Sequence, residues 1–278
     1  MWLRHWGLTR DPFGPLAHRN PSSFVATPSR EEAVARLVHA IEAAHPSARL
    51  VAAPGLGKTT VLERAFQLAR SPSRRVAVAS GPIDGAGLIA SLAEGLGVRV
   101  APGAGRASAW RSLADAARLC RFQGLHVVLA VDDCQMLVDP ADRLDLDRLD
   151  HVDPDPSARV SVIRVGRPDP DPDGMDRTPR WDLAIRLEAY TRSEAAAYLD
   201  ARLAASGRPA PTFTPRAQAR LHALSGGVPR GLDRLAHLAL MAGALRGLEI
   251  ITPDVVDASA HECDGVHAAV EFARWGDA

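Results

Sequence analysis

The fold of this chain is decided by the stretch Leu50-Val51-Ala52-Ala53-Pro54-Gly55-Leu56-Gly57-Lys58-Thr59-Thr60. Its first part, residues 50–53, is short and apolar and predicts a β-strand, and the pattern over residues 58–69 predicts a helix. Residues 52–59 match the phosphate-loop pattern G-x-x-x-x-G-K-[ST] except at the first position, where Ala52 replaces glycine. We expect this methyl group to be tolerated, because the residue lies where the strand leaves the sheet. A strand, a glycine loop and a helix in this order predict a nucleotide-binding loop.

The lysine of this loop is unusual in its own right. All 33 basic side chains of the chain are arginine apart from Lys58. A compact ammonium on a flexible stem can curl over the loop to phosphate oxygens, for which a planar guanidinium is too wide. The glycines let backbone N–H groups point at the phosphates, and the hydroxyl of Thr59 can bind magnesium. The predicted ATP-binding residues of the loop are Pro54, Gly55, Leu56, Gly57, Lys58, Thr59 and Thr60.

A second motif follows about 75 residues later, where the apolar segment Val127–Val131 ends in Asp132-Asp133-Cys134-Gln135. This segment predicts a strand whose end lies beside the phosphate loop. Asp132 is the predicted second ligand of Mg²⁺, together with Thr59, and Asp133 is predicted to orient and polarise the attacking water. The two motifs together predict a site for ATP and Mg²⁺.

The remaining patterns predict two domains. Further strands are predicted at residues 75–80, 126–131, 160–165 and 184–187, with helical segments such as 107–122 between the first of them. This alternation predicts an α/β fold, a P-loop NTPase with a parallel sheet and helices on both faces. From residue 191 onward, only helices are predicted, at about 193–206, 215–224, 230–245 and 253–260. We therefore expect a nucleotide-binding core over residues 1–189, with an N-terminal wrapping segment, and a small helical lid with a C-terminal tail over residues 190–278.

The beginning of the chain has little predicted structure. Residues 1–29 contain several prolines and are expected to be irregular, with Ser29 capping a helix that begins at Arg30.

Composition limits the possible partners and compartments. With 278 residues and 33 basic side chains against 33 acidic ones, the chain shows no overall charge that would indicate nucleic acid or acidic lipid. Its first residues do not form a signal peptide, and no stretch is apolar for long enough to cross a bilayer, so no transmembrane segment is expected. The odd number of cysteines, Cys120, Cys134 and Cys263, fits a reducing compartment. These features predict a cytoplasmic protein.

Three other features have ordinary interpretations. His261, Cys263 and His267 lie close together but lack the spacing and the fourth ligand of a zinc site, so packing or solvation is preferred. Residues 139–155 are rich in aspartate interrupted by arginine, which predicts a solvated surface. Cys134 has no histidine nearby in sequence and is expected to be a small buried residue rather than a nucleophile.

Several motifs together carry a family resemblance. They are His5-Trp6-Gly7-Leu8 with Asp11-Pro12-Phe13, Phe24–Ala33, the phosphate loop, Asp132–Gln135, Gly166-Arg167-Pro168 and Ser225-Gly226-Gly227-Val228-Pro229-Arg230. In order and spacing, over nearly the whole chain, they resemble the AAA+ ATPases of the general secretion pathway protein A (ExeA-like) type. That family is similar in turn to the ATPases that regulate DNA transposition and replication initiation.

The resemblance implies further roles. The segment that contains Pro12 and Phe13 would lie against adenine, and Arg230 matches the sensor-2 arginine that reaches the γ-phosphate. Arg180 falls where such proteins can carry an arginine finger for the nucleotide of a neighbouring subunit, although a surface arginine is the alternative. Arg167 stands where a polar sensor-1 residue is expected, and an arginine is unusual there. A homo-oligomer is implied as well.

One departure from the family concerns hydrolysis. Asp133 replaces the glutamate expected after the magnesium aspartate, which sets the carboxylate back by one methylene, about 1.5 Å. We therefore predict slow hydrolysis. Three functions are compatible with the sequence: an ATPase that drives or gates the assembly or remodelling of a protein partner, a DNA-associated ATPase of the transposition-regulator type, and a nucleotide-gated scaffold with little hydrolysis.

Overall fold

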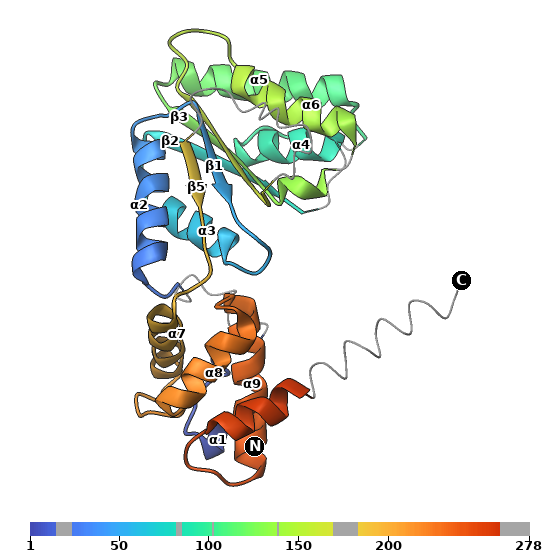
Figure 1. Ribbon diagram of the computed structural model, residues 1–278. Coiled ribbons are helices and arrows are strands. Elements are labelled where there is room, and N and C mark those ends of the chain that lie inside the picture. Colours follow the sequence, from blue (N-terminus) through green and yellow to red (C-terminus); the bar gives the residue numbers. More distant parts are fainter. Residues whose placement is uncertain (15–23, 82–84, 102, 138, 169–182, 262–278) are drawn as a thin grey trace, which may run out of the picture. The chain divides into compact units, whose positions relative to one another are not determined.

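The chain forms two compact units, which the computed structural model describes over residues 1–14, 24–81, 85–101, 103–137, 139–168 and 183–261 (Figure 1). The α/β unit comprises Glu32–Pro54 and Lys58–Leu187. The helical unit comprises Met1–Glu31, Gly55–Gly57 and Glu188–Ala278. The prediction of a nucleotide-binding core over residues 1–189 and a lid over residues 190–278 stays a prediction.

The α/β unit is built on a five-stranded parallel sheet, as predicted. Its strands are β1 (Ser47–Val51), β2 (Arg74–Ser80), β3 (His126–Asp132), β4 (Val160–Gly166) and β5 (Leu183–Arg186), in the spatial order β2-β3-β4-β1-β5. All seven residues of β3 are buried, whereas exposure alternates along the edge strand β2. This difference explains why the interior strand reads as a continuous apolar run in the sequence.

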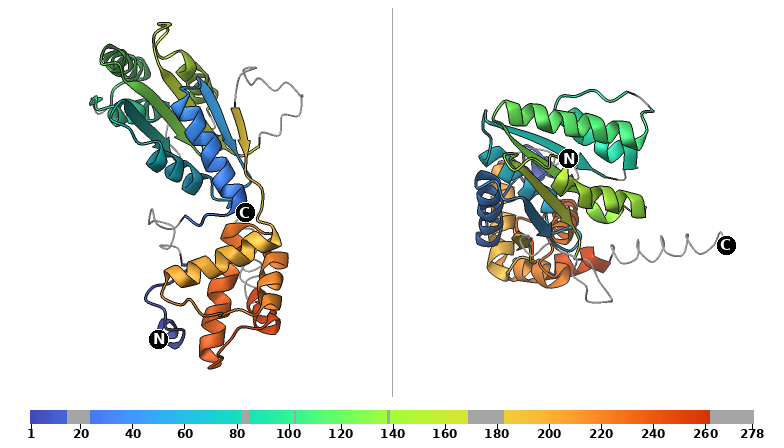
Figure 2. Two further views of the ribbon diagram at one scale, coloured as in Figure 1. Left: turned by 90° about the vertical axis from the view of Figure 1, so that its left-hand side faces the viewer. Right: turned by 90° about the horizontal axis from the view of Figure 1, so that it is seen from above.

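Helices cover both faces of the sheet (Figures 1 and 2). On one face lie α2 (Pro28–Glu42) and α3 (Lys58–Leu68), and on the other lie α4 (Gly85–Gly95), α5 (Arg106–Phe122) and α6 (Pro140–Arg148). Short 3₁₀ turns, η2 (Cys134–Met136) and η3 (Leu149–His151), flank α6. The second face is closed by a cluster in which Leu88, Ile89 and Leu92 of α4 pack with Leu113 of α5 and Leu129 of β3.

The prediction that residues 139–155 form a solvated surface holds for exposed residues such as Asp139 and Asp147 but is wrong for three of the aspartates. Asp142 and Asp145 of α6 are buried, and the guanidinium of Arg106 donates to both carboxylates at 2.8 Å. Asp153 is likewise buried and accepts a hydrogen bond from Arg121 at 2.9 Å. The arginines that neutralise these carboxylates come from α5, more than 30 residues earlier in the chain, so the local sequence does not reveal them. Burial of the charges is compensated by these pairs.

The helical unit has its own hydrophobic core. It contains α7 (Arg192–Ala205), α8 (Pro215–Ser225), α9 (Pro229–Leu245) and a helix over residues 253–261, close to the predicted positions. The N-terminal segment forms the short helix α1 (Trp2–His5) instead of being fully irregular. Trp6, which is 1% exposed, donates its indole N–H to the carbonyl of Leu240 at 2.8 Å. A Cβ at Gly243 would lie 2.9 Å from the Trp6 ring, so the glycine lets the indole pack directly on α9.

The start of α7 is fixed by a carboxylate with several donors. Thr191 and Glu194 form a reciprocal capping box, in which the Glu194 carboxylate accepts from the Thr191 N–H at 3.0 Å. The same carboxylate accepts from the backbone N–H of Ser29 at 3.0 Å. Helix α2 begins at Pro28, two residues before the predicted start, because the N–H groups of Arg30 and Glu31 bond to the carbonyl of Thr27. Burial alone would raise the pKa of Glu194, but the hydrogen bonds from Ser29 and Thr191 outweigh it and lower the pKa to about 2.

We predict that Glu194→Gln lowers the melting temperature at neutral pH but not at strongly acidic pH. Because the pKa of Glu194 is lower in the folded chain than its ordinary value of 4.5, the charged form stabilises the fold above pH 4.5. This contribution disappears as the pH falls from 4.5 to about 2, so the difference between wild type and variant should vanish over that interval. Circular dichroism melts between pH 7 and pH 2 measure it. Glu249→Gln, at an exposed carboxylate, is the control, and a pH-independent difference for Glu194→Gln would refute the assignment.

Candidate nucleotide-binding site

The loop after β1 has the backbone that a phosphate cradle requires. Gly55 and Gly57 adopt φ values of +82° and +85°, which side-chain-bearing residues rarely adopt. The loop leads directly into α3, whose first turn presents N–H groups without partners inside the helix. Ala52 follows β1 immediately, and its N–H donates to the carbonyl of Gly166 at 3.1 Å. This residue therefore belongs to the strand end, as expected, and its methyl group is buried there.

Lys58 is folded back over the loop. It is only 8% exposed, and its Nζ donates to the carbonyl of Ala52 at 3.1 Å and to that of Ala53 at 3.4 Å. The ammonium therefore lies within the curve of the loop, where anionic oxygens can replace the carbonyls as its partners. A buried lysine held by carbonyl oxygens at a helix start is suited to an anionic ligand.

The two predicted magnesium ligands meet in the structure. The hydroxyl of Thr59 donates to Oδ2 of Asp132 at 2.6 Å. Strands β1 and β3 are not neighbours, because β4 lies between them. The contact is made because α3 begins at the carboxyl edge of the sheet, where parallel strands place their ends together.

Burial raises the pKa of the Asp132 carboxyl above its ordinary value, and the nearby charge of Asp133 adds to this effect. The hydrogen bonds from Thr59 and from the Asp133 N–H and the positive charge of Lys58 lower the pKa, but they do not outweigh burial. Oδ1 and Oδ2 are each already bonded, at 2.8 Å to Asp133 N–H and at 2.6 Å to Thr59, so the carboxylate has a fixed orientation.

Asp133 has an uncommon backbone conformation, and its carboxylate accepts a hydrogen bond from one side chain. Its φ of 56° and ψ of 44° lie in the left-handed region, which aspartate tolerates better than most residues. Its Oδ1 accepts from Nε2 of Gln135 at 2.7 Å. Gln135 in turn accepts from the backbone N–H of Arg167 through Oε1 at 3.2 Å. The sequence motif that contains Gln135 indicates no role for it, and only the adjacency of β3 and β4 reveals these contacts.

Cys134 is not poised as a nucleophile, in agreement with the sequence interpretation. Its thiol donates to the carbonyl of Val131 at 3.2 Å, and burial raises its pKa to about 11.

The structure describes two of the three arginines to which the family resemblance gives a role. Arg230 lies in the second position of α9 with an exposed side chain, and its backbone N–H donates to the carbonyl of Gly55 at 3.3 Å within the helical unit. Arg167 follows the end of β4 directly and is exposed. Arg180 lies outside the described residues. The roles of Arg230, Arg167 and Arg180 towards phosphate stay predictions.

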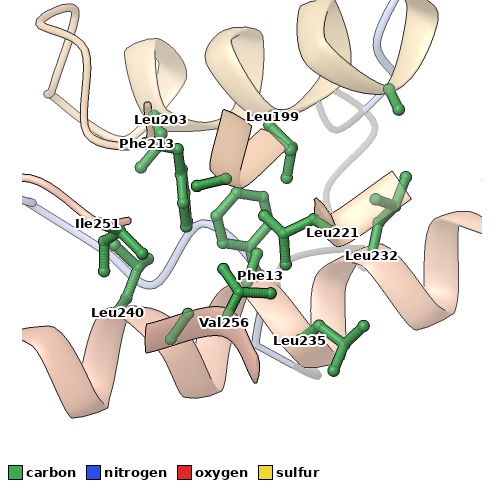
Figure 3. Packing of buried hydrophobic residues seen from close by; sticks show 14 of the residues in the cluster. Phe13, Leu199, Leu203, Phe213, Leu221, Leu232, Leu235, Leu240, Ile251 and Val256 are labelled. Carbon is green, nitrogen blue, oxygen red and sulfur yellow. The ribbon is translucent and has the colours of Figure 1, made fainter. Parts of the chain in front are cut away.

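The segment expected to contact adenine is anchored by its own side chains. Phe13, 4% exposed, packs among Leu199, Leu232 and other apolar residues of the helical core (Figure 3). The carbonyl of Pro12 accepts from Nε of Arg202 at 2.8 Å. Because the Phe13 ring is committed to the core, any adenine contact from this segment would use its backbone or neighbouring atoms. The adenine-binding roles of Pro12 and Phe13 stay predictions.

The residues present fit a nucleotide and a divalent cation. The hydroxyl of Thr59 and the carboxylate of Asp132 are hard oxygen donors already in contact, as Mg²⁺ prefers. The positive-φ glycines and the folded Lys58 suit the phosphates.

Elsewhere, Cys263 and His267 lie outside the described residues, so the interpretation of that cluster is not tested. In the part of the chain that the structure covers, no helix combines the length and apolarity needed to cross a membrane.

Comparison with known proteins agrees with this geometry. Residues 43–171 match the family model described as an AAA domain. The chain is 26% identical over 273 residues to general secretion pathway protein A of Aeromonas hydrophila. The aligned region covers 96% of this chain and 49% of the relative. The chain therefore spans about half the length of that relative.

Solved structures show the same fold at low identity. Cdc6p of Pyrobaculum aerophilum superposes with a TM-score of 0.73 at 20% identity, over 92% of this chain and 71% of that one. Orc1 of Aeropyrum pernix, solved in complex with DNA, superposes with a TM-score of 0.69 at 19% identity, over 91% of this chain and 68% of that one. The RuvB Holliday junction branch migration motor of Thermotoga maritima superposes with a TM-score of 0.56 at 18% identity, over 86% of this chain and 70% of that one. With an AAA domain over residues 43–171 and a parallel five-stranded P-loop sheet like that of these structures, this chain has an AAA+ fold.

Proposed function

We propose that this chain binds Mg²⁺·ATP on the loop after β1 and hydrolyses it slowly, and that the nucleotide cycle drives or gates the assembly or remodelling of a protein partner. The observation that carries the proposal is the 2.6 Å contact between Thr59 and Asp132, which joins the phosphate loop to the end of β3. Cytoplasm is the compartment that fits best, because ATP is abundant there and the described cysteines Cys120 and Cys134 are both free thiols.

Each residue of the site has a distinct role in this proposal. Backbone N–H groups of the loop and Lys58 hold the phosphates, and Thr59 and Asp132 hold the cation. The cation supplies neutralisation of the negative charge on the phosphate oxygens. Asp133 orients the attacking water and accepts its proton. Arg230 and, from a neighbouring copy, Arg180 are proposed to contact the γ-phosphate as forked donors.

The geometry of Asp133 supports the proposal of slow turnover. Its side chain is one methylene shorter than glutamate, and its Oδ1 is engaged by Gln135 at 2.7 Å. A carboxylate that stands back by about 1.5 Å orients water less well, and misplacement of this size reduces rates strongly. We therefore expect binding and hydrolysis to be separable in this chain.

Two alternatives rest on specific observations. The likeness to the Orc1 protein solved with DNA and to a branch migration motor supports the alternative of a DNA-associated ATPase, although at such identities it concerns the fold alone. The short side chain of Asp133 supports the alternative of a nucleotide-gated scaffold with little hydrolysis. The name of the Aeromonas relative points to secretion, and the partner in our proposal is a protein that such a pathway assembles.

Phosphate release by the purified chain, with and without duplex DNA at two salt concentrations, distinguishes the three functions. Our proposal predicts slow Mg²⁺-dependent release that DNA does not stimulate. Salt-sensitive stimulation by DNA would favour the DNA-associated ATPase, because contacts with backbone phosphates weaken as salt rises. Tight ATP binding without release would identify the scaffold.

Lys58→Met should weaken the affinity for Mg²⁺·ATP by roughly tenfold to a hundredfold, because hydrogen bonds to charged groups contribute about 1.5–3 kcal/mol. Titration with a fluorescent ATP analogue measures this. Arg70→Met, which removes an exposed cation at the end of α3, is the matched control and should leave the affinity unchanged. Since Lys58 is the single lysine, reductive ¹³C-methylation gives one lysine NMR signal, and ATP should shift it. An unchanged affinity in Lys58→Met would disprove this role.

Asp133→Glu should raise turnover by roughly tenfold with little change in ATP affinity, since the longer side chain brings the carboxylate to the water. Steady-state phosphate release at saturating ATP provides the test. Asp147→Glu makes the same chemical change at an exposed position of α6 and should have no effect. Turnover that stayed the same or fell in Asp133→Glu would show that Asp133 is not a shortened catalytic base.

A further inference from the structure

A continuous path of hydrogen bonds joins the phosphate loop to the end of β4. Thr59 donates to Oδ2 of Asp132, whose Oδ1 accepts from the backbone N–H of Asp133 at 2.8 Å. The Asp133 carboxylate accepts from Nε2 of Gln135, and Oε1 of Gln135 accepts from the backbone N–H of Arg167.

The path then returns to the loop. Gly166, next to Arg167, accepts at its carbonyl from the N–H of Ala52 at 3.1 Å. The ring thus begins and ends on the phosphate loop, and all its members belong to the α/β unit. Gln135 is the one side-chain amide in it, and from η2 directly after β3 it reaches the end of β4, which follows only after α6 and η3 in the chain.

The amide of Gln135 is suited to this position. A carboxylate needs a donor and a backbone N–H needs an acceptor, and an amide supplies one of each from a single rigid group. The side chain also lies against Gly166, where a Cβ would approach Oε1 of Gln135 to 3.2 Å. The absence of a side chain at Gly166 therefore keeps the amide close to the end of β4.

We propose that Gln135 is a positioning residue for hydrolysis: its amide holds the Asp133 carboxylate at a fixed place relative to the end of β4. Asp133 needs this support more than a glutamate would. Its backbone lies in the left-handed region, and its short side chain has little reach with which to correct an error in direction. This inference rests on the proposed hydrolytic function, and it concerns a residue that contacts neither nucleotide nor cation in that proposal.

Three substitutions separate hydrogen bonding from packing. Gln135→Met keeps the length and volume but removes both hydrogen bonds. Gln135→Glu keeps an oxygen for the Arg167 N–H but faces Asp133 with a second carboxylate. Gln123→Met makes the first change at an exposed position after α5 and serves as the control.

We expect Gln135→Met and Gln135→Glu to lower kcat by roughly tenfold or more, which corresponds to the loss of one hydrogen bond to a charged group. The dissociation constant for ATP and the melting temperature should stay close to those of the wild type, as should every property of Gln123→Met. Unchanged kcat in Gln135→Met would overturn the proposal, and so would a loss confined to ATP affinity.

A double-mutant cycle tests whether Gln135 acts through Asp133. Single-turnover hydrolysis of γ-³²P-labelled ATP, followed over hours, measures the slow variants. In an Asp133→Asn background, Gln135→Met should have less than a twofold further effect, because the carboxylate that it positions is gone. An equal effect in both backgrounds would show that Gln135 acts by another route and would overturn the inference. Absence of hydrolysis in the wild type is a different result, since it refutes the proposed ATPase function itself.

Discussion

The hydrogen bond between Thr59 and Asp132 is the interaction on which the arrangement of the site depends. It joins the first turn of α3 to the end of β3 across the intervening strand β4. The contact forms where parallel strands end at one edge and a helix begins over them. The same edge collects Ala52, Gly166 and Gln135, so the loop, the acidic strand end and the end of β4 form one hydrogen-bonded unit.

The sheet that presents this edge is held by charges inside the α/β unit. Arg164, 8% exposed on β4, engages both carboxylate oxygens of Asp150 at 3.0 and 2.7 Å and also donates to Ser47 on β1. The pairs of Arg106 with Asp142 and Asp145 fasten α6 to α5 in the same way. An arginine fork can satisfy two acceptors at once, which makes buried carboxylates tolerable. Removing either partner from such a pair leaves an uncompensated buried charge.

In the proposed function, nucleotide binding and hydrolysis depend on different parts of this structure. The proposed phosphate cradle uses the backbone geometry at Gly55 and Gly57 and the folded side chain of Lys58. The proposed hydrolysis depends on the direction of one short carboxylate, Asp133, whose backbone is left-handed and whose Oδ1 accepts from Gln135. The fold is that of AAA+ ATPases, whereas the rate that we propose depends on these few side chains.

The sequence by itself determined the class of fold and the two motifs of the site. The glycine loop and the buried strands were recognisable because their patterns are local: a run of apolar residues for an interior strand, and a fixed spacing of glycine and lysine for the loop. The predicted positions of the five strands and of most helices agree with the structure for this reason. The tertiary structure alone decided the partners of residues that are distant in the chain. The burial of Asp142 and Asp145 depends on Arg106, the packing of residues 1–14 with the helical unit depends on α9, and the role of Gln135 depends on β4 lying beside β3. These contacts join segments separated by tens to hundreds of residues, and no local pattern in the sequence encodes which of them will meet.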